Sequence, residues 1–413
     1  MRTRRALSGL ITADVVSTLG SEMTTVALPW FVLVTTGSPA RMGAVLAAEF
    51  AGLTVLGLFS GRAATALGPR RTMLGSDLAR AGLVALIPVL FTFGLLSFPV
   101  ILAIAFVVGG FFPSYQSSSR LILAGLVEDD ELRLTRVGGL LNAVNESASF
   151  LGPPLGGLFV VLLGPSPVLL LDAGSYALSF LLIATLVPSV PRTAEEENDG
   201  DTSVRAGLRY LWRERRLRRL VVGVGIIEIG FTAITATAPI LALQLTGGLH
   251  DGLSTGGNGG ASVVGWLLGA YGAGSVVGGL VSTRARGTGS RTPVLAILAL
   301  ATSTWVLLLP VPVWGRALAI AGNGVAAGLF FPRFFANLTT QTPPALRARV
   351  LTAVMVALSA PGPIGFLGAG ALAQWTGSAT ASLLLVAVAA SIGAAIVVSA
   401  YAVPAPSAEP LTD

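Results

Sequence analysis

The sequence predicts an all-α polytopic membrane protein with twelve transmembrane helices in two six-helix bundles. Of its 413 residues, 53% are hydrophobic and only 11% are charged, and the mean hydropathy is +0.80. Soluble domains carry about a quarter charged residues, so this composition excludes that class. Apolar stretches of about 20 residues recur along the chain, and each is long enough to cross a ~30 Å hydrocarbon core as a helix. The 51 glycines agree, because small residues let helices approach closely in lipid.

The predicted spans follow one another at short intervals and leave one long hydrophilic segment in the middle of the chain. Their ranges are 8–35, 42–60, 72–93, 97–119, 137–163, 166–188, 219–246, 261–283, 292–310, 316–340, 350–373 and 379–402. This spacing predicts four regions, namely an N-terminal six-helix bundle at 1–188, a cytoplasmic linker at 189–218, a C-terminal six-helix bundle at 219–402 and a cytoplasmic tail at 403–413.

The linker combines an acidic, turn-rich first part with an amphipathic second part. From Ser203 onward, one helical face carries Val204, Leu208, Leu211 and Trp212, and another carries Arg205, Arg209, Arg213 and Arg216. An apolar face opposite an arginine stripe predicts a helix that lies on the inner leaflet of the membrane. Its simplest role is to tether the two bundles.

Orientation follows from arginine, because cytoplasmic loops of membrane proteins are enriched in basic residues. All 26 basic residues are arginines. With a cytoplasmic N-terminus, only Arg41 and Arg316 fall on the outer side. We therefore expect a multi-pass protein of the plasma (cytoplasmic) membrane with both termini cytoplasmic.

Missing residue types exclude most enzyme classes. Without lysine the chain has no P-loop for a nucleotide and no Schiff-base chemistry. Without cysteine it has no thiolate nucleophile or thiolate metal site, and its single histidine, His250, lies in a glycine-rich loop. We expect no enzyme activity, cofactor or metal. The net charge of +6 follows the membrane topology, so we expect no nucleic-acid partner.

Two glycine-rich motifs resemble those of the major facilitator superfamily. Residues 61–71, GRAATALGPRR, resemble the loop between its second and third helices, G-x-L-A-D-R-x-G-R-R. The matching positions are Gly61, Gly68, Arg70 and Arg71, whereas Thr65 and Ala66 replace the aspartate and arginine of the pattern. Residues 139–157, GLLNAVNESASFLGPPLGG, resemble the antiporter motif of the fifth helix. The matches there are Gly139, Gly152, Pro153, Gly156 and Gly157, with Ala148 in place of one glycine.

Further segments resemble the macrolide-efflux and enterobactin-exporter branch of drug:proton antiporters. They are LGSEMTTVALPWFVLVTTGSP at 19–39, RTMLGSDLARA at 71–81 and RAGLRYLWRERRLRRL at 205–220. The two halves also echo each other, since GFFPSYQ at 110–116 resembles GLFFPRF at 328–334. The resemblance implies the major facilitator fold, with a substrate site near the membrane midplane between two repeats.

Ionisable residues inside predicted spans are costly unless they have a partner or a task, so they are the candidates for proton coupling. Asp14, Thr18, Glu22 and Thr25 form one polar stripe on the first span, which we expect to face the central cavity. Asp14 lies near the inner end, where pairing with arginine is the alternative. Asp172 is expected to be a cap or surface anchor, and the asparagines to bind cargo or hold helices together. The candidates for coupling or cavity lining are Glu22, Glu228, Asp14, Glu49, Glu146 and Arg333, the last as a buried counter-charge; static ion pairs are the alternative.

The loop motif lacks its acid, and Asp77 is the residue that we expect to replace it. Asp77 lies about one turn inside the third span, and Arg80 follows one turn later. We predict that Asp77 pairs with Arg70, Arg80 or Arg120 at an inner gate.

The sequence thus predicts a secondary transporter that exports an amphipathic small molecule, such as a drug, an antibiotic or a siderophore-like natural product, by proton antiport with alternating access. Its partners would be the small-molecule substrate, protons and the lipid bilayer, and we expect a monomer. An importer or facilitator of a small metabolite on the same fold is the first alternative. A transport-inactive receptor or a membrane enzyme is the second, against which the buried carboxylates and the missing residue types argue.

Overall fold

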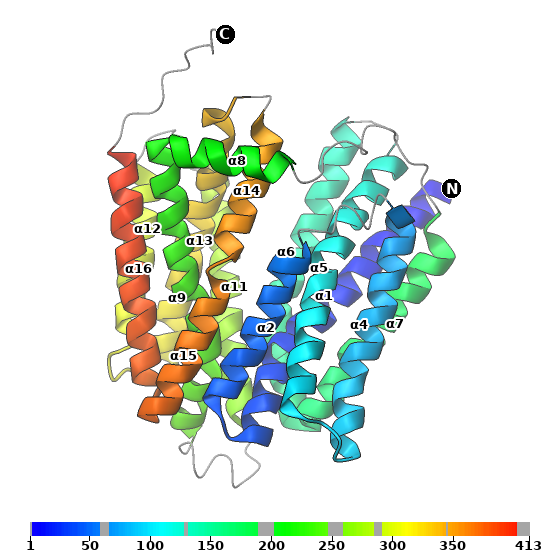
Figure 1. Cartoon of the computed structure of the whole chain (residues 1–413), viewed down its shortest axis with the longest axis horizontal. Coiled ribbons are helices and arrows are strands. Elements are labelled where there is room, and N and C mark those ends of the chain that lie inside the picture. The colour runs from blue at the N-terminus through cyan, green and yellow to red at the C-terminus, as the bar shows by residue number, and fades with distance from the viewer. Residues whose placement is uncertain are drawn as a thin grey trace. The chain divides into compact units, whose positions relative to one another are not determined.

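The chain forms long helices throughout the part that the structure, a computed structural model, describes (Figure 1). The described residues are 2–57, 66–127, 131–188, 202–246, 259–284, 291–343 and 346–402. No strand occurs within these ranges. The all-helical prediction is therefore confirmed, whereas the first part of the linker and the tail at 403–413 lie outside the described residues.

Within the described residues, six helices precede the linker and form the N-terminal bundle. Their bounds are α1 Arg2–Thr36, α2 Pro39–Gly57, α4 Pro69–Thr92, α5 Phe98–Leu126, α6 Glu131–Leu163 and α7 Pro165–Leu186. Within the bundle, α1 packs on α6 and α7, α2 packs on α5, and α4 packs on both α5 and α7. Gly52 of α2 and Gly109 of α5 make the α2–α5 approach possible, because a Cβ at either position would collide with the backbone of the other helix.

Eight helices follow in the described part of the chain, and every predicted span of the second half corresponds to at least one of them. Their bounds are α8 Thr202–Arg213, α9 Arg215–Thr246, α11 Gly259–Arg284, α12 Arg291–Val306, α13 Val313–Gln341, α14 Arg347–Ser359, α15 Gly362–Thr376 and α16 Ala379–Tyr401. The span predicted at 350–373 is broken between α14 and α15. Pro361 and Pro363 explain the break, because proline lacks the amide hydrogen that continues a helix.

The helices have the length and the surface expected of a membrane protein. Nine helical segments of the described chain are long and apolar enough to cross a bilayer, and one of them is Val350–Thr376, which α14 and α15 form together. The apolar segments Ser147–Leu163 and Arg291–Val306 are shorter. Large apolar side chains are exposed along them, including Leu162, Leu181 and Leu318. A soluble protein rarely exposes so much contiguous apolar surface, whereas a bilayer solvates it.

Two compact units divide the chain. The first comprises Met1–Asn198, Ala236–Gly269 and Gly370–Ala379, and the second comprises Asp199–Thr235, Ala270–Ala369 and Thr380–Asp413. The N-terminal bundle therefore lies wholly in the first unit. These units do not divide the chain at the linker. The division into two six-helix bundles, which follows the internal sequence repeat, stays a prediction.

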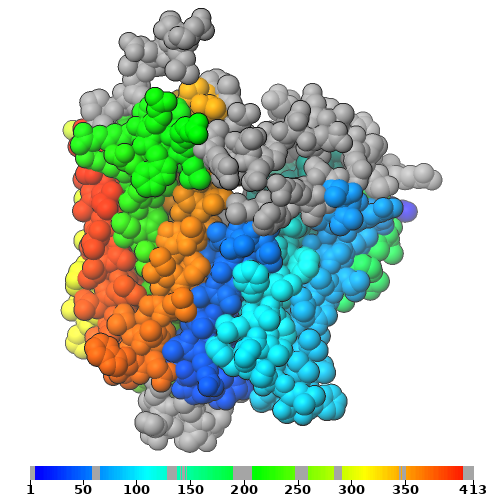
Figure 2. Space-filling view, viewed as in Figure 1, coloured from blue at the N-terminus to red at the C-terminus, as the bar shows by residue number. Residues whose placement is uncertain are grey.

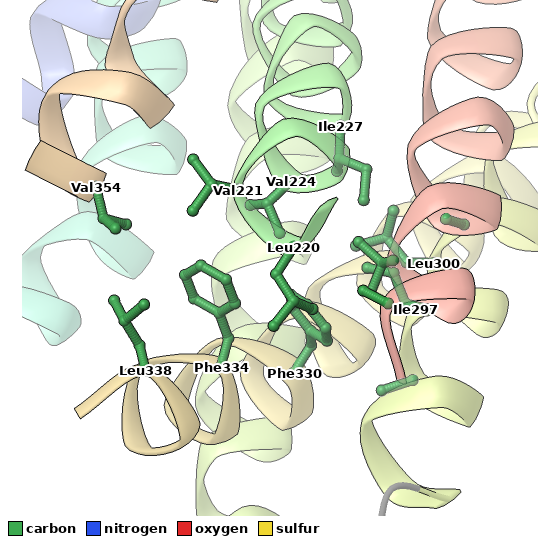
Figure 3. Packing of buried hydrophobic residues seen from close by; sticks show 14 of the residues in the cluster. Leu220, Val221, Val224, Ile227, Ile297, Leu300, Phe330, Phe334, Leu338 and Val354 are labelled. Atoms are coloured by element: carbon green, nitrogen blue, oxygen red, sulfur yellow. The ribbon is translucent and has the colours of Figure 1, made fainter. Parts of the chain in front are cut away.

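The second unit has one large apolar core. It forms where α9, α12, α13 and α14 meet, and its residues recur at helical spacing on each of them (Figure 3). The rings of Phe330 and Phe334 on α13 stack with their centroids 5.8 Å apart. Around them lie Leu220, Val221, Val224, Ile227, Ile297, Leu300, Leu338 and Val354.

The predicted amphipathic helix is present as α8 and belongs to this second unit. It runs crosswise to the long helices and packs on α14, as Figures 1 and 2 show. Leu211 is buried in the core of the unit, whereas Trp212, Arg209 and Arg213 are exposed. The tyrosine hydroxyl of Tyr210 donates to the carbonyl oxygen of Gln341 over 3.3 Å and so ties α8 to the end of α13.

Candidate functional site

The polar stripe of α1 faces α6 inside the N-terminal bundle. Asp14 is fully buried and accepts a hydrogen bond of 2.9 Å from the side-chain amide of Asn145. The hydroxyl of Thr18 donates to the side-chain oxygen Oδ1 of Asn145 over 3.4 Å. The hydrogen-bond donor that the structure gives Asp14 is thus a neutral amide on the adjacent helix, and pairing with an arginine at the inner surface stays a prediction.

Glu22, one turn further along the stripe, lies against the glycine-rich part of α6. Its Oε1 accepts a hydrogen bond of 2.7 Å from Ser149, and the side chain is half-buried. Gly152 lies directly against the Cβ of Glu22, and a Cβ at Gly156 would come within 2.6 Å of the carbonyl oxygen of Met23. The two glycines thus let α6 approach α1 at the level of this carboxylate.

The remaining motif residues of α6 differ in their environments. Pro153 and Gly157 are buried, whereas Gly139 is exposed and has open space where a side chain would go. Glu146 lies on α6, but its side chain is outside the described residues.

A second polar cluster surrounds Arg80 on α4. Its guanidinium lies 2.8 Å from Oδ1 of Asp77, and both side chains are excluded from solvent. Oδ2 of Asp77 accepts a hydrogen bond of 2.6 Å from Ser179 on α7. The guanidinium also lies over two aromatic rings, 4.6 Å from the centroid of Tyr115 and 4.3 Å from that of Tyr176. The pairing predicted for Asp77 is thus present with Arg80, and its role in gating stays a prediction.

Tyr176 connects this cluster to a third group of polar residues. Its hydroxyl lies 2.7 Å from the hydroxyl of Ser21 on α1. One turn earlier on α7, Asp172 accepts hydrogen bonds of 2.7 Å from Thr24 and 3.2 Å from Ser175. Asp172 is 1% exposed, so the expectation that it is a cap or surface anchor is wrong. Its carboxylate points into the bundle toward α1.

Tyr176, Asp172 and their hydroxyl partners on α1 border a cavity of about 40 Å³ in the N-terminal bundle. Its polar lining consists of two carboxylates, Glu49 on α2 and Asp172 on α7, and three hydroxyls. The remaining lining is aliphatic and comes from α1, α4, α5 and α7; the hydroxyls belong to Ser21, Thr24 and Tyr176. A water molecule needs roughly 10–15 Å³ measured in this way, so the cavity has room for water beside the carboxylates.

The loop motif positions the start of α4. Gly68 precedes the helix with φ +83°, a left-handed conformation that favours glycine. Arg70 donates hydrogen bonds of 2.6 Å to the carbonyl oxygens of Val187 and Ala184, and so caps the C-terminal end of α7. Arg71 and Arg120 are exposed, and Gly61 lies outside the described residues.

The candidates of the second unit lie in different surroundings. Glu228 on α9 is partly buried. Arg333 on α13 donates to Oγ of Ser282 over 2.7 Å and to the carbonyl oxygen of Leu329 over 3.0 Å. Among the described residues no ion pair joins Arg333 to a carboxylate, so its predicted role as a counter-charge is not seen. Asn323 and Asn337 hydrogen-bond to neighbouring helices, as expected of residues that hold helices together.

The main omission of the sequence reasoning is α7. Asp172, Ser175, Tyr176 and Ser179 recur at helical spacing and form a polar stripe as regular as the one singled out on the first span. A second stripe on α1, Ser17, Ser21 and Thr24, faces it. The signal was therefore in the sequence, in the helical spacing of hydroxyl side chains around the carboxylate of Asp172.

Apolar helices of spanning length, buried carboxylates and a helix pair that packs through glycines define a polytopic membrane transporter. The sequence profile of the Major Facilitator Superfamily matches residues 10–261, more than half of the chain. The chain belongs to this superfamily, and it is a transporter, not an enzyme.

Among curated proteins, the chain is similar to multidrug efflux pumps. It is 29% identical over 368 residues to the multidrug efflux pump Tap of Mycolicibacterium fortuitum, and the aligned region covers 87% of each chain. It is 26% identical over 378 residues to the multidrug efflux pump Tap of Mycobacterium tuberculosis, covering 89% of this chain and 87% of the pump. An uncharacterised major-facilitator-type transporter of Bacillus subtilis, YfiS, is 24% identical over 395 residues and covers 93% and 90%.

Solved structures of transporters share the fold. The nucleoside transporter NupG superposes with a TM-score of 0.73 at 12% identity, covering 96% of this chain and 98% of its own. The D-xylose–proton symporter superposes with a TM-score of 0.72 at 13% identity, covering 98% and 99%. At such identities the likeness establishes the major facilitator fold alone.

Proposed function

We propose that this protein exports amphipathic small molecules from the cytoplasm by proton antiport. It would act as a monomer in the plasma membrane with both termini cytoplasmic, and its two six-helix halves would alternate in exposing a midplane site. The similarity to two proteins named as multidrug efflux pumps supports export. The arginine bias supports the orientation.

The observation that carries the proposal is the position of Glu22. Its carboxylate is half-buried, accepts the Ser149 hydroxyl and lies where Gly152 and Gly156 bring α6 against α1. A carboxylate held in a bilayer interior, where charge is costly, is suited to exchange a proton for a cargo molecule. Movement between α1 and α6 during the transport cycle would change the surroundings of this group directly.

In the proposed cycle, Glu22 releases its proton to the cytoplasm as cargo binds and takes up another from the outside. Asp14, buried beneath the Asn145 amide, would keep the inner end of the stripe polar. The Asp77–Arg80 pair would hold α4 and α7 together near the inner loop, in place of the acid missing at Thr65. Glu228 and the described part of α9 would supply the corresponding surface of the second half.

The test uses everted membrane vesicles that contain the protein, energised so that their interior is acidic. Ethidium, a lipophilic cation, is added as the probe, and its accumulation is followed together with collapse of the pH gradient. We expect accumulation that disappears with a protonophore and falls at least tenfold in Glu22→Gln. Glu214→Gln, the same chemical change in the segment between α8 and α9, is the control and is expected to transport normally. Unchanged transport by Glu22→Gln would remove Glu22 from the mechanism.

Import of a metabolite is the second candidate, since the fold is shared with a D-xylose–proton symporter and a nucleoside transporter. Everted vesicles separate the two directions. An exporter accumulates the probe against an interior-acid gradient, whereas a proton-coupled importer is driven in right-side-out vesicles by an exterior-acid gradient.

A further inference from the structure

The cavity of the N-terminal bundle holds two carboxylates that the proposed Glu22 mechanism does not use. Asp172 and Glu49 reach it from α7 and α2, both of which contact α1. Each oxygen of Asp172 accepts a hydroxyl, from Thr24 or Ser175. No hydrogen bond to the carboxylate of Glu49 occurs among the described residues, although the side chain lines the same cavity.

The charges that surround this cavity do not balance. Asp14, Asp77 and Asp172 are each at most 1% exposed, and the partly buried Glu49 also lines the cavity. Arg80 is the one arginine that is buried in the described part of the bundle, and its ion pair is with Asp77. The hydroxyls of Tyr115 and Tyr176 also face the interior and are neutral. The half-buried Glu22 lies against α6, and Arg120 on α5 is exposed.

Among the described residues, neither Asp172 nor Glu49 forms an ion pair, because the guanidinium of Arg80 is paired with Asp77. Two carboxylate charges without an ion-pair partner are costly inside a bundle that is itself in lipid. Asp14 has an amide donor and is separate from the cavity lining. Glu49 and Asp172, in contrast, border one small space, and two carboxylates that share a site relieve their repulsion when one of them binds a proton. A cation other than a proton is disfavoured, because the Thr24 hydroxyl donates to Asp172 and the Ser21 and Tyr176 hydroxyls are bonded to one another.

We propose that Glu49 and Asp172 form a proton-binding pair inside the N-terminal bundle, distinct from Glu22, with one proton shared between the two carboxylates across the cavity. Its role in transport rests on the proposed proton antiport, whereas its existence does not. Ser21 and Tyr176 link the pair to the Arg80 cluster, because Tyr176 lines the cavity and its ring lies under the Arg80 guanidinium. Loss of the shared proton would therefore add a negative charge next to the contacts that join α1, α4 and α7.

The direct test is infrared spectroscopy of the purified protein in lipid vesicles, without any cargo. Protonated carboxyl groups give a separate C=O stretching band that shifts in D₂O, and we expect such a band near neutral pH. Glu49→Gln and Asp172→Asn should each remove the same component, corresponding to one carboxyl group per protein. Glu22→Gln and Glu214→Gln should keep it. The proposal that the two carboxylates share a proton would be contradicted if the band survives in both Glu49→Gln and Asp172→Asn. Loss of the component in only one of the two variants would contradict it as well.

Transport measurements then separate this inference from the proposed function. If the pair participates in coupling, Glu49→Gln should lower ethidium-dependent proton release at least tenfold in the everted vesicles. Sodium added in place of a proton gradient should not drive uptake, and sodium-driven uptake would overturn the assignment of a proton to the site. Absence of any proton-coupled flux in the unmodified protein would contradict the proposed antiport. The infrared band would still show whether Glu49 and Asp172 share a proton. Folding of both variants is checked by size-exclusion chromatography, and Glu49→Gln is the milder change because no hydrogen bond to its carboxylate is described.

Discussion

The carboxylate of Asp77 and the guanidinium of Arg80 form an ion pair of 2.8 Å that is closed off from solvent. The pair lies one helical turn apart on α4 and is completed by Ser179 of α7 and by the rings of Tyr115 and Tyr176. A buried pair of this kind contributes little net stability compared with apolar residues, but loss of one partner leaves an uncompensated charge.

Asp77→Asn should therefore destabilise the protein by about 3–5 kcal/mol, because it leaves the Arg80 charge buried without its partner. Arg80→Gln alone should have a similar effect. The double variant Asp77→Asn/Arg80→Gln should be more stable than the sum of the two single losses predicts. Thermal unfolding in detergent, analysed as a double-mutant cycle, measures this coupling; additive losses would show that the two charges do not stabilise each other.

The two ends of the α6 glycine motif offer a matched pair of variants. Gly152→Ala should strongly reduce transport, because the new Cβ meets the Cβ of Glu22 and pushes α6 away from α1. Gly139→Ala makes the same chemical change where a Cβ has open space, so it should be silent. Ethidium accumulation in everted vesicles compares them at equal expression. Equal activity of the two variants would mean that the close α1–α6 approach is not needed for transport.

Much of the fold could be predicted from the sequence, because twelve apolar stretches of spanning length leave few other structures in a bilayer. Helix ends were less predictable. The fourth span was expected to end at 119, but α5 continues to Leu126, since nothing in SSSRLILAGL breaks a helix once it leaves the apolar region. The break between α14 and α15 carries a clear signal in Pro361 and Pro363, which the expectation of a continuous span overlooked.

The candidate site was only partly predictable. Asp77 could be assigned to an arginine because both lie on one helix, and their separation along the chain fixes their distance in space. The partners of Glu49 and Asp172 could not be assigned in this way. They depend on which helices of the bundle are neighbours, and helix periodicity gives the face of a residue but not the helix that this face meets.

Arg70 and Arg71 test the cap at the end of α7. Arg70→Ala should cost about 1 kcal/mol, because it removes two hydrogen bonds to the last carbonyl groups of the helix and a favourable charge at its negative end. Arg71→Ala removes a charge of the same sign from an exposed side chain, so it should have little effect. Thermal unfolding of the two variants gives the comparison, and an equal loss in both would point to the charge of the loop and not to the cap.

α8 offers neighbouring residues with opposite surroundings, Leu211 at 3% exposure and Trp212 at 59%. Leu211→Ala should destabilise the protein by about 2–5 kcal/mol, because it leaves a cavity in the core that α8 shares with α9 and α13. Trp212→Ala should leave unfolding unchanged, since its side chain is exposed and does not contribute to the core. If α8 lies on the inner leaflet as predicted, this side chain is in the membrane interface. The readout for Trp212→Ala is tryptophan fluorescence in vesicles whose lipids carry a quencher near the headgroup. This variant should lack the component of the fluorescence that these lipids quench. Persistence of that component in Trp212→Ala would mean that α8 does not place this side chain in the membrane interface.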